Sequence, residues 1–153
     1  MISVDSDYFV LELKPSTIPG VGLGVFAKLD IEPGIVIAEY RGSIILNEDR
    51  NVARFSDRCL YLNKDVIIAG NNCIASFVND AIQFKETYTK GEIEEIEKNK
   101  HFPLYPDKNY NCVFMKTLFK AFIVTSKPIK QDEELFCDYG IKYWINRVKT
   151  IDS

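Results

Sequence analysis

Apolar residues in this chain fall into short runs, and polar or glycine-containing turns separate one run from the next. Short runs rich in β-branched and aromatic residues are typical of strands. Many short strands with few helices predict a mainly β domain. We predict strands over residues 8–13, 24–28, 35–40, 43–46, 60–62, 66–69, 111–115, 118–125 and 134–137.

The turns between these runs indicate how neighbouring strands pair. Gly42 predicts a short hairpin in which residues 43–46 return beside residues 35–40. The polar triplet Asn63-Lys64-Asp65 predicts a second hairpin between the apolar runs on either side of it. The first half of the chain therefore reads as a β meander.

Two segments carry helical signals instead. Residues 91–100 form a charged run in which Ile93 and Ile96 share one face, which is typical of a short surface helix. Asn47 is suited to cap a helix over residues 47–56, because acidic residues follow it in the first turn. We expect few helices beyond these.

Length and composition describe an ordinary globular protein. A chain of 153 residues suits one domain, and 46% hydrophobic with 27% charged residues argues against wholesale disorder. The first residues form neither a basic region nor an apolar stretch, and no later apolar run is long enough to cross a bilayer. We therefore expect an intracellular protein that does not act in a membrane.

The charge and the cysteines narrow the function further. A net charge of -3 disfavours a dedicated nucleic-acid binder and suits a basic partner, such as a lysine-rich protein tail. The four cysteines lie far apart, and His101 is the only histidine. This spacing disfavours a structural zinc site, so we expect no metal and favour buried thiols over a disulfide framework.

Four segments, in one order along the chain, carry candidate chemistry. They read Gly22-Leu-Gly-Val-Phe-Ala27, Ile31-Glu-Pro-Gly-Ile-Val-Ile-Ala-Glu-Tyr-Arg-Gly42, Ala75-Ser-Phe-Val-Asn-Asp80 with Asn111-Cys112 after it, and Glu133-Glu-Leu-Phe-Cys-Asp-Tyr-Gly140 followed by Tyr143-Trp144. Together they resemble the SET domain family of S-adenosylmethionine-dependent protein lysine methyltransferases. One Gly-x-Gly turn alone would be a weak signal, so the resemblance rests on the ordered set.

The resemblance covers about residues 8–148 and implies the SET fold. This fold has several small curved sheets, few short helices and a knot-like threading of the C-terminal segment. We expect a single SET domain over residues 1–153. Residues at about 83–107 lie where family members vary most, and we expect an insertion there that either shapes the substrate groove or is inert.

The resemblance places Tyr139 at the centre of the active site, where it aligns the methyl group and the attacking amine. A phenol suits this role because it can donate a hydrogen bond and yet stays neutral at physiological pH, with an ordinary pKa of about 10. Tyr61 lies on a predicted strand. It either acts in the lysine channel or at the cofactor, or is an ordinary strand aromatic.

A cofactor site for S-adenosylmethionine, with S-adenosylhomocysteine as the product, follows from the same resemblance. The loop Gly22, Leu23 and Gly24 matches the one that contacts the methionine part of the cofactor. Asn79 matches an asparagine whose amide both donates and accepts, as a zwitterion requires. Asp80 replaces the family's histidine, and the contact expected at this position, made largely through backbone atoms, would survive that change.

Departures from the family pattern lie on both sides of Tyr139. No Cys-x-Cys run follows it, so the zinc-bearing tail of many relatives is missing, and we expect Trp144 to close the cofactor site by stacking. For Tyr143 we prefer simple packing. Cys137 stands where relatives hold a larger channel residue, and its small size predicts room for di- or trimethylation.

Other polar residues of the C-terminal half receive structural interpretations. Glu133 and Glu134 are adjacent on a predicted strand and point to opposite faces, so we do not assign them acid and base roles. Asp132 stands where the family often has glycine, and aspartate tolerates the left-handed turn. His101 is interpreted as a loop or helix-end residue.

The sequence thus predicts a methyltransferase that acts on a protein lysine, with a histone tail as the family's best-known substrate class. The peptide would lie beside a strand, its lysine entering a channel opposite the cofactor. A non-catalytic peptide-binding module and a methyltransferase of a non-histone protein remain the alternatives. The expected location is nuclear for a histone substrate and cytoplasmic otherwise, and the oligomeric state stays open.

Overall fold

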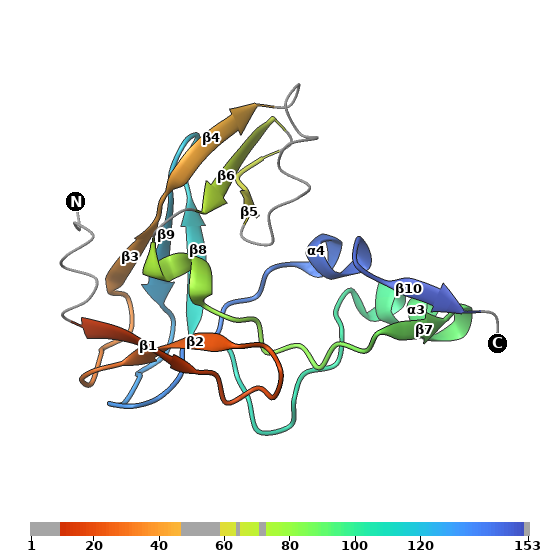
Figure 1. The fold of residues 1–153 in the computed structure, drawn as a ribbon, viewed down its shortest axis with the longest axis horizontal. Coiled ribbons are helices and arrows are strands. Elements are labelled where there is room, and N and C mark those ends of the chain that lie inside the picture. The colour runs from red at the N-terminus through yellow and green to blue at the C-terminus, as the bar shows by residue number, and fades with distance from the viewer. Residues whose placement is uncertain (1–9, 47–58, 64, 71–72, 152–153) are drawn as a thin grey trace.

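The computed structural model describes residues 10–46, 59–63, 65–70 and 73–151. These residues form mainly strands, arranged in several small sheets, as predicted (Figure 1). Antiparallel sheets are formed by β1 (Leu11–Pro15) with β2 (Leu23–Ala27), by β3 (Val36–Tyr40), β9 (Ala121–Thr125) and β8 (Cys112–Lys116), and by β4 (Gly42–Leu46), β6 (Val66–Gly70) and β5 (Cys59–Tyr61).

The helices that the structure describes are short. The 3-10 helix η2 (Ile74–Phe77) lies under the strands, whereas α3 (Lys90–Asn99) and α4 (Ile141–Ile145) lie at one end of the molecule. A capping box between Thr89 and Glu92 starts α3, and Lys100 ends it in a left-handed conformation. The predicted helix is therefore confirmed, and no described helix is long and apolar enough to cross a membrane.

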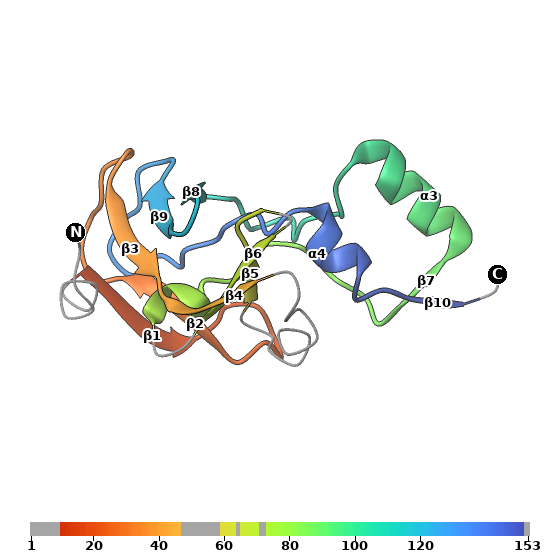
Figure 2. The ribbon, with the colours of Figure 1, turned by 90° about the horizontal axis from the view of Figure 1, so that it is seen from above.

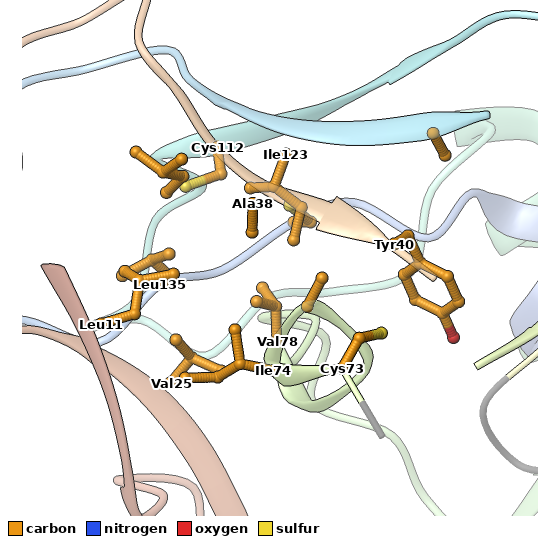
Figure 3. Close-up of a cluster of buried hydrophobic side chains, with 14 of the residues drawn as sticks. Leu11, Val25, Ala38, Tyr40, Cys73, Ile74, Val78, Cys112, Ile123 and Leu135 are labelled. Atoms are coloured by element: carbon orange, nitrogen blue, oxygen red, sulfur yellow. The ribbon is translucent and has the colours of Figure 1, made fainter. Parts of the chain in front are cut away.

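One apolar cluster connects the three antiparallel sheets. Leu11, Val25, Ala38, Ile123 and Leu135 come from different parts of the chain and converge on η2 (Figure 3). All five are completely buried. Burial of this extent supplies most of the folding free energy. We call β1 to β6, η2, β8 and β9, with this cluster, the main body.

The segment that leads to Tyr139 is threaded between two earlier parts of the chain. The backbone N–H of Cys137 donates to the carbonyl of Asn79 at 3.0 Å, and that of Cys112 donates to the carbonyl of Phe136 at 3.2 Å. The bridges on both sides are parallel. This is the placement that the expected C-terminal threading requires.

A second, smaller group of elements lies beside the main body. The strands β7 (Thr87–Thr89) and β10 (Lys149–Ile151) pair in parallel, and α3 and α4 lie next to them (Figures 1 and 2). We call residues 82–104 and 141–151 the C-terminal lobe. Its apolar cluster buries Tyr88 and Phe102, with Trp144 partly buried against it.

Three details of the sequence prediction need correction. The hairpin at Gly42 is wrong, because β4 pairs with β6 and β3 pairs with β9. Residues 134–137 form isolated bridges rather than a strand, since the segment changes partners along its length. Residues 118–120 belong to the turn before β9. The helix predicted over residues 47–56 lies outside the described residues.

Candidate active site

Tyr139 emerges where the threaded segment leaves the main body. Its hydroxyl donates a short hydrogen bond to the carbonyl of Val78, and its backbone N–H donates to Asp80 at 2.9 Å. Burial raises the pKa of this phenol well above its ordinary value, and the nearby groups of Tyr143 and Asp80 add to the effect. The hydroxyl therefore stays protonated and fixed in direction.

Two cavities meet at this tyrosine. One has a volume of about 720 Å³ and the other of about 600 Å³. Both are lined by Ser76, Tyr139 and Tyr143. A group bound in one cavity can thus approach a group bound in the other across the ring of Tyr139. After the roles that the sequence analysis predicts for their residues, we call the smaller one the cofactor cavity and the larger one the acceptor cavity.

The predicted cofactor residues gather around the cofactor cavity. Gly22, Leu23, Asn79, Asp80 and Trp144 all line it. Gly22 has a φ of 85°, a left-handed conformation that favours glycine. The loop can therefore turn sharply and present its backbone to a ligand.

Gly24 has a different reason to lack a side chain. It lies within β2 and is not among the residues that line the cofactor cavity. A Cβ atom there would overlap with the carboxylate of Glu134. That buried carboxylate accepts hydrogen bonds from Ser16, Thr17 and Asn79. Gly24 thus makes room for the group that fixes the glycine loop and the Asn79 amide relative to each other.

The side chain of Asp80 is buried, with 4% of the residue exposed. Its Oδ2 atom accepts a hydrogen bond from Nε1 of Trp144 at 2.8 Å, and its Oδ1 atom accepts one from the hydroxyl of Tyr110 at 2.6 Å. Burial raises the pKa of this carboxyl, and the hydrogen bonds from Tyr110, Trp144 and Tyr139 oppose the shift. The replacement for histidine is therefore integrated into the structure through its side chain.

Aromatic rings wall the acceptor cavity. Tyr40, Tyr61, Phe114 and Tyr143 line it together with Tyr139. Tyr61 thus lines this cavity, although its ring is not buried, and its role in a lysine channel stays a prediction. Rings of this kind exclude water and present electron-rich faces to a cation.

Cys137 is placed elsewhere. It is completely buried in the main core beside Cys112 and does not line the acceptor cavity. The threading of its segment turns this side chain inward, so room for higher methylation states does not come from it. Among the described residues, no group of three or more His, Cys, Asp or Glu side chains is arranged to hold a metal ion.

Sequence reasoning missed several walls of the two cavities. Phe84 and Tyr105 line the cofactor cavity, so the expected insertion contributes to the cofactor side and to none of the described walls of the acceptor cavity. No motif marks either residue. Tyr143, interpreted as simple packing, contacts the ring of Tyr139 at 4.7 Å and lines both cavities. Its position only four residues after Tyr139 in the chain was an available signal.

Known proteins resemble this chain over most of the residues described above. A model of the SET domain matches residues 22–140. Among solved structures, one chain of the humanized mutant of the Chaetomium thermophilum Polycomb Repressive Complex 2 bound to the inhibitor GSK126 is similar, with a TM-score of 0.58, 22% identity and 85% of this chain covered. The match spans 15% of that chain, and at this identity it supports the fold alone. No curated protein matches this chain.

Proposed function

Because this chain belongs to the SET domain family, we propose that it is an S-adenosylmethionine-dependent methyltransferase of protein lysine side chains. One observation carries the proposal, namely that the cofactor cavity and the acceptor cavity join at Tyr139. Methyl transfer is an in-line displacement, in which donor and nucleophile must approach from opposite sides. Two cavities that share Ser76, Tyr139 and Tyr143 as walls are compatible with this requirement.

The residues of the cofactor cavity fit the proposed cofactor. Its volume of about 600 Å³ suits a ligand of this size. The amide of Asn79 and the backbone at Gly20 and Gly22 would hold the zwitterionic tail, and the rings of Phe84 and Trp144 would face the adenine. When bound, S-adenosylmethionine supplies a methyl group carried on a sulfonium.

Tyr139 would act through its oxygen atom. Its proton points to the carbonyl of Val78, so the lone pairs of the hydroxyl remain available at the junction of the cavities. A fixed oxygen dipole stabilises positive charge that develops beside it, and costs no reorganisation during the reaction. The raised pKa of this phenol keeps it neutral at every physiological pH.

The acceptor cavity would prepare the lysine amine. Lysine is a nucleophile only after it loses a proton, and its ordinary pKa of about 10.4 opposes this. Lys116 lines the same cavity, and burial lowers the pKa of its amine even though much of its side chain is exposed. A substrate lysine that enters deeper between the aromatic rings would be shifted in the same direction.

A histone tail is the substrate class that we propose to test first. The support is the acidic balance of the chain, with a net charge of -3, and the family resemblance. The described residues that line the acceptor cavity include Lys116 and Lys142 and no acidic side chain. We therefore propose that the substrate residues that enter beside the target lysine are apolar or acidic, while more distant ones are basic.

A methyl-transfer assay tests the proposed function directly. The purified chain is incubated with radiolabelled S-adenosylmethionine and either histones or a whole-cell extract. We expect labelled protein, and we expect Tyr139→Phe to reduce the rate about a hundredfold or more, because it removes the oxygen at the junction. Tyr88→Phe, which changes a tyrosine of the C-terminal lobe that lines neither cavity, is the matched control.

Calorimetric titration with S-adenosylmethionine separates the enzyme from a non-catalytic module. An enzyme binds at micromolar concentration and transfers label. Absence of binding at high micromolar concentration would rule out the enzyme. Binding of the cofactor and of peptides without any labelled product from either substrate pool would favour the peptide-binding module.

A further inference from the structure

The carboxylate of Asp80 is surrounded by hydrogen-bond donors. Oδ1 accepts from the Tyr110 hydroxyl at 2.6 Å and from the backbone of Ile82 at 3.2 Å. Oδ2 accepts from Trp144 Nε1 at 2.8 Å and from the backbone of Tyr139 at 2.9 Å. Four donors and no acceptor favour the ionised form, because a proton on either oxygen would face a donor, and they thereby oppose the rise in the pKa of this carboxyl that burial causes.

The two groups on Oδ2 both belong to the site. Trp144 lines the cofactor cavity, and Tyr139 stands at its junction with the acceptor cavity. Their rings are parallel, at an interplanar angle of 3° and a centroid distance of 5.9 Å. One oxygen atom of Asp80 therefore fixes the position of the Trp144 ring and that of the Tyr139 backbone at the same time.

Trp144 is also held by contacts within the lobe, where it is partly buried against the apolar cluster around Tyr88 and Phe102. It lies in α4, a helix of five residues with no buried residue, and its further ring contacts are to Phe84 at 4.9 Å and to Tyr143 at 5.0 Å. Both neighbours lie in the C-terminal lobe. The bond to Asp80 is a charge-assisted hydrogen bond from this ring to a residue outside the lobe, and such bonds are stronger than neutral ones.

The other oxygen, Oδ1, fixes the position of Asp80 itself through its hydrogen bond from Tyr110. The hydroxyl of Tyr110 lies 3.2 Å from Nε2 of His101, which in turn lies 3.3 Å from the carboxylate of Asp138. This chain of polar groups ends one residue before Tyr139. The orientation of the Asp80 carboxylate is thus fixed from both sides.

We propose that Asp80 is a positioning residue whose buried carboxylate holds Trp144 over the cofactor cavity and Tyr139 at the junction of the two cavities. This inference rests on the proposed function, because it gives a role to walls of the same site. Asp80 itself would act through these two residues, without taking part in the transfer. The side chain thereby supplies a closure that would otherwise depend on contacts within the lobe and on stacking against Tyr139.

Substitution of Asp80 should loosen Trp144, and Trp144 is the only tryptophan of the chain. In Asp80→Ala we expect a red-shifted emission and a stronger quenching by acrylamide, both measured without cofactor. Asp80→Asn keeps the shape and one acceptor oxygen, so its emission should stay close to that of the wild type. Asp107→Asn, at an exposed aspartate, controls for the change in net charge.

Affinity for S-adenosylhomocysteine, measured by calorimetry, gives the second readout. We expect a Kd about tenfold to a hundredfold weaker for Asp80→Ala and less than tenfold weaker for Asp80→Asn, as befits the loss of a charge-assisted hydrogen bond. In the assay, KM for S-adenosylmethionine should rise more than kcat falls in Asp80→Asn. In a double-mutant cycle, the effects of the substitutions at Asp80 and of Trp144→Phe should be non-additive, because both act on the same hydrogen bond.

The outcomes separate this inference from the proposed function. Unchanged emission, quenching and Kd in a folded Asp80→Ala overturn the positioning role, whether or not the wild type transfers methyl groups. If Asp80→Ala does not fold, the cycle of Asp80→Asn with Trp144→Phe decides, and additive losses overturn the role. Loosening of Trp144 in a protein that binds no cofactor would support the tie while refuting the proposed function.

Discussion

The main body and the C-terminal lobe hold their elements in different ways. The main body buries one apolar cluster between three sheets, and its strands pair over as many as five residues. In the lobe, Ile82, Tyr88, Ile96 and Phe102 are buried around one helix, and its two strands pair over three residues. We therefore expect the lobe to open at a lower free energy than the main body.

The two regions also contribute differently to the candidate site. Both cavities take Tyr143 from the lobe and Ser76 from the main body, and the cofactor cavity takes Phe84 and Trp144 from the lobe as well. A ligand that binds only the closed lobe stabilises the closed state by mass action. We therefore predict that affinity for the proposed cofactor depends more on the order of the lobe, whereas global stability depends more on the core.

The strongest way to separate the two regions is to damage the core. Leu135→Ala removes a completely buried side chain of the main cluster and should lower the free energy of unfolding by about 3 kcal/mol, since it leaves a cavity. Urea unfolding measures the change. Leu118→Ala, at an exposed leucine of the turn before β9, should change the free energy by less than about 0.5 kcal/mol. Equal losses in both variants would contradict this picture of the core.

The core could largely be predicted from the sequence. The alternation of Ala121, Ile123 and Thr125 with less buried residues is the burial pattern that β9 adopts. Pairing was harder, because local turn signals favoured a hairpin at Gly42, while the true partner of β4 lies more than twenty residues further along. Non-local pairing depends on the whole fold and leaves no signal in one segment.

The candidate site shows the same difference between local signals, which can be predicted, and non-local contacts, which cannot. Tyr139 and Asn79 were predicted from the family motifs, and Trp144 was predicted from the missing Cys-x-Cys run after Tyr139. Phe84 and the tie between Asp80 and Tyr110 could not be predicted, because residues thirty apart meet only after the chain is threaded. The substitution at Asp80 was visible as a departure from the family, but its consequence was not.

Damage to the lobe should produce the opposite result from damage to the core. Phe102→Ala removes a buried ring that contacts Phe84 and Tyr88. If the lobe opens separately, the global unfolding midpoint should fall less than in Leu135→Ala, whereas the affinity for S-adenosylhomocysteine should fall about tenfold or more. Calorimetry and urea unfolding measure the two effects. A midpoint shift as large as that of Leu135→Ala would mean that the two regions unfold as one cooperative unit.

A pH titration tests the contribution to stability of Asp80, where the main body and the lobe meet. Burial raises the pKa of this carboxyl in the folded state, so the folded protein binds the proton more tightly than the unfolded chain does. The contribution of Asp80 to stability is therefore full below about pH 4, the ordinary pKa of aspartate, and is lost as pH rises through the folded pKa. Relative to Asp80→Asn, the wild type should lose free energy of unfolding over this window. If the wild type instead gained free energy of unfolding relative to Asp80→Asn as pH rises, the raised pKa of Asp80 would be contradicted.

The smallest expected effect concerns the end of a single helix. Thr89→Ala removes the capping box that starts α3 and should cost about 1 kcal/mol, because it leaves the backbone N–H of Glu92 without its side-chain acceptor. If the lobe opens on its own, this cost should appear as faster hydrogen exchange of the α3 amides, with β9 unchanged. Thr87→Ala, in the same strand but outside the cap, is the matched control. Faster exchange in β9 as well would mean that the lobe and the main body unfold together, and the distinction between them would then describe packing without describing stability.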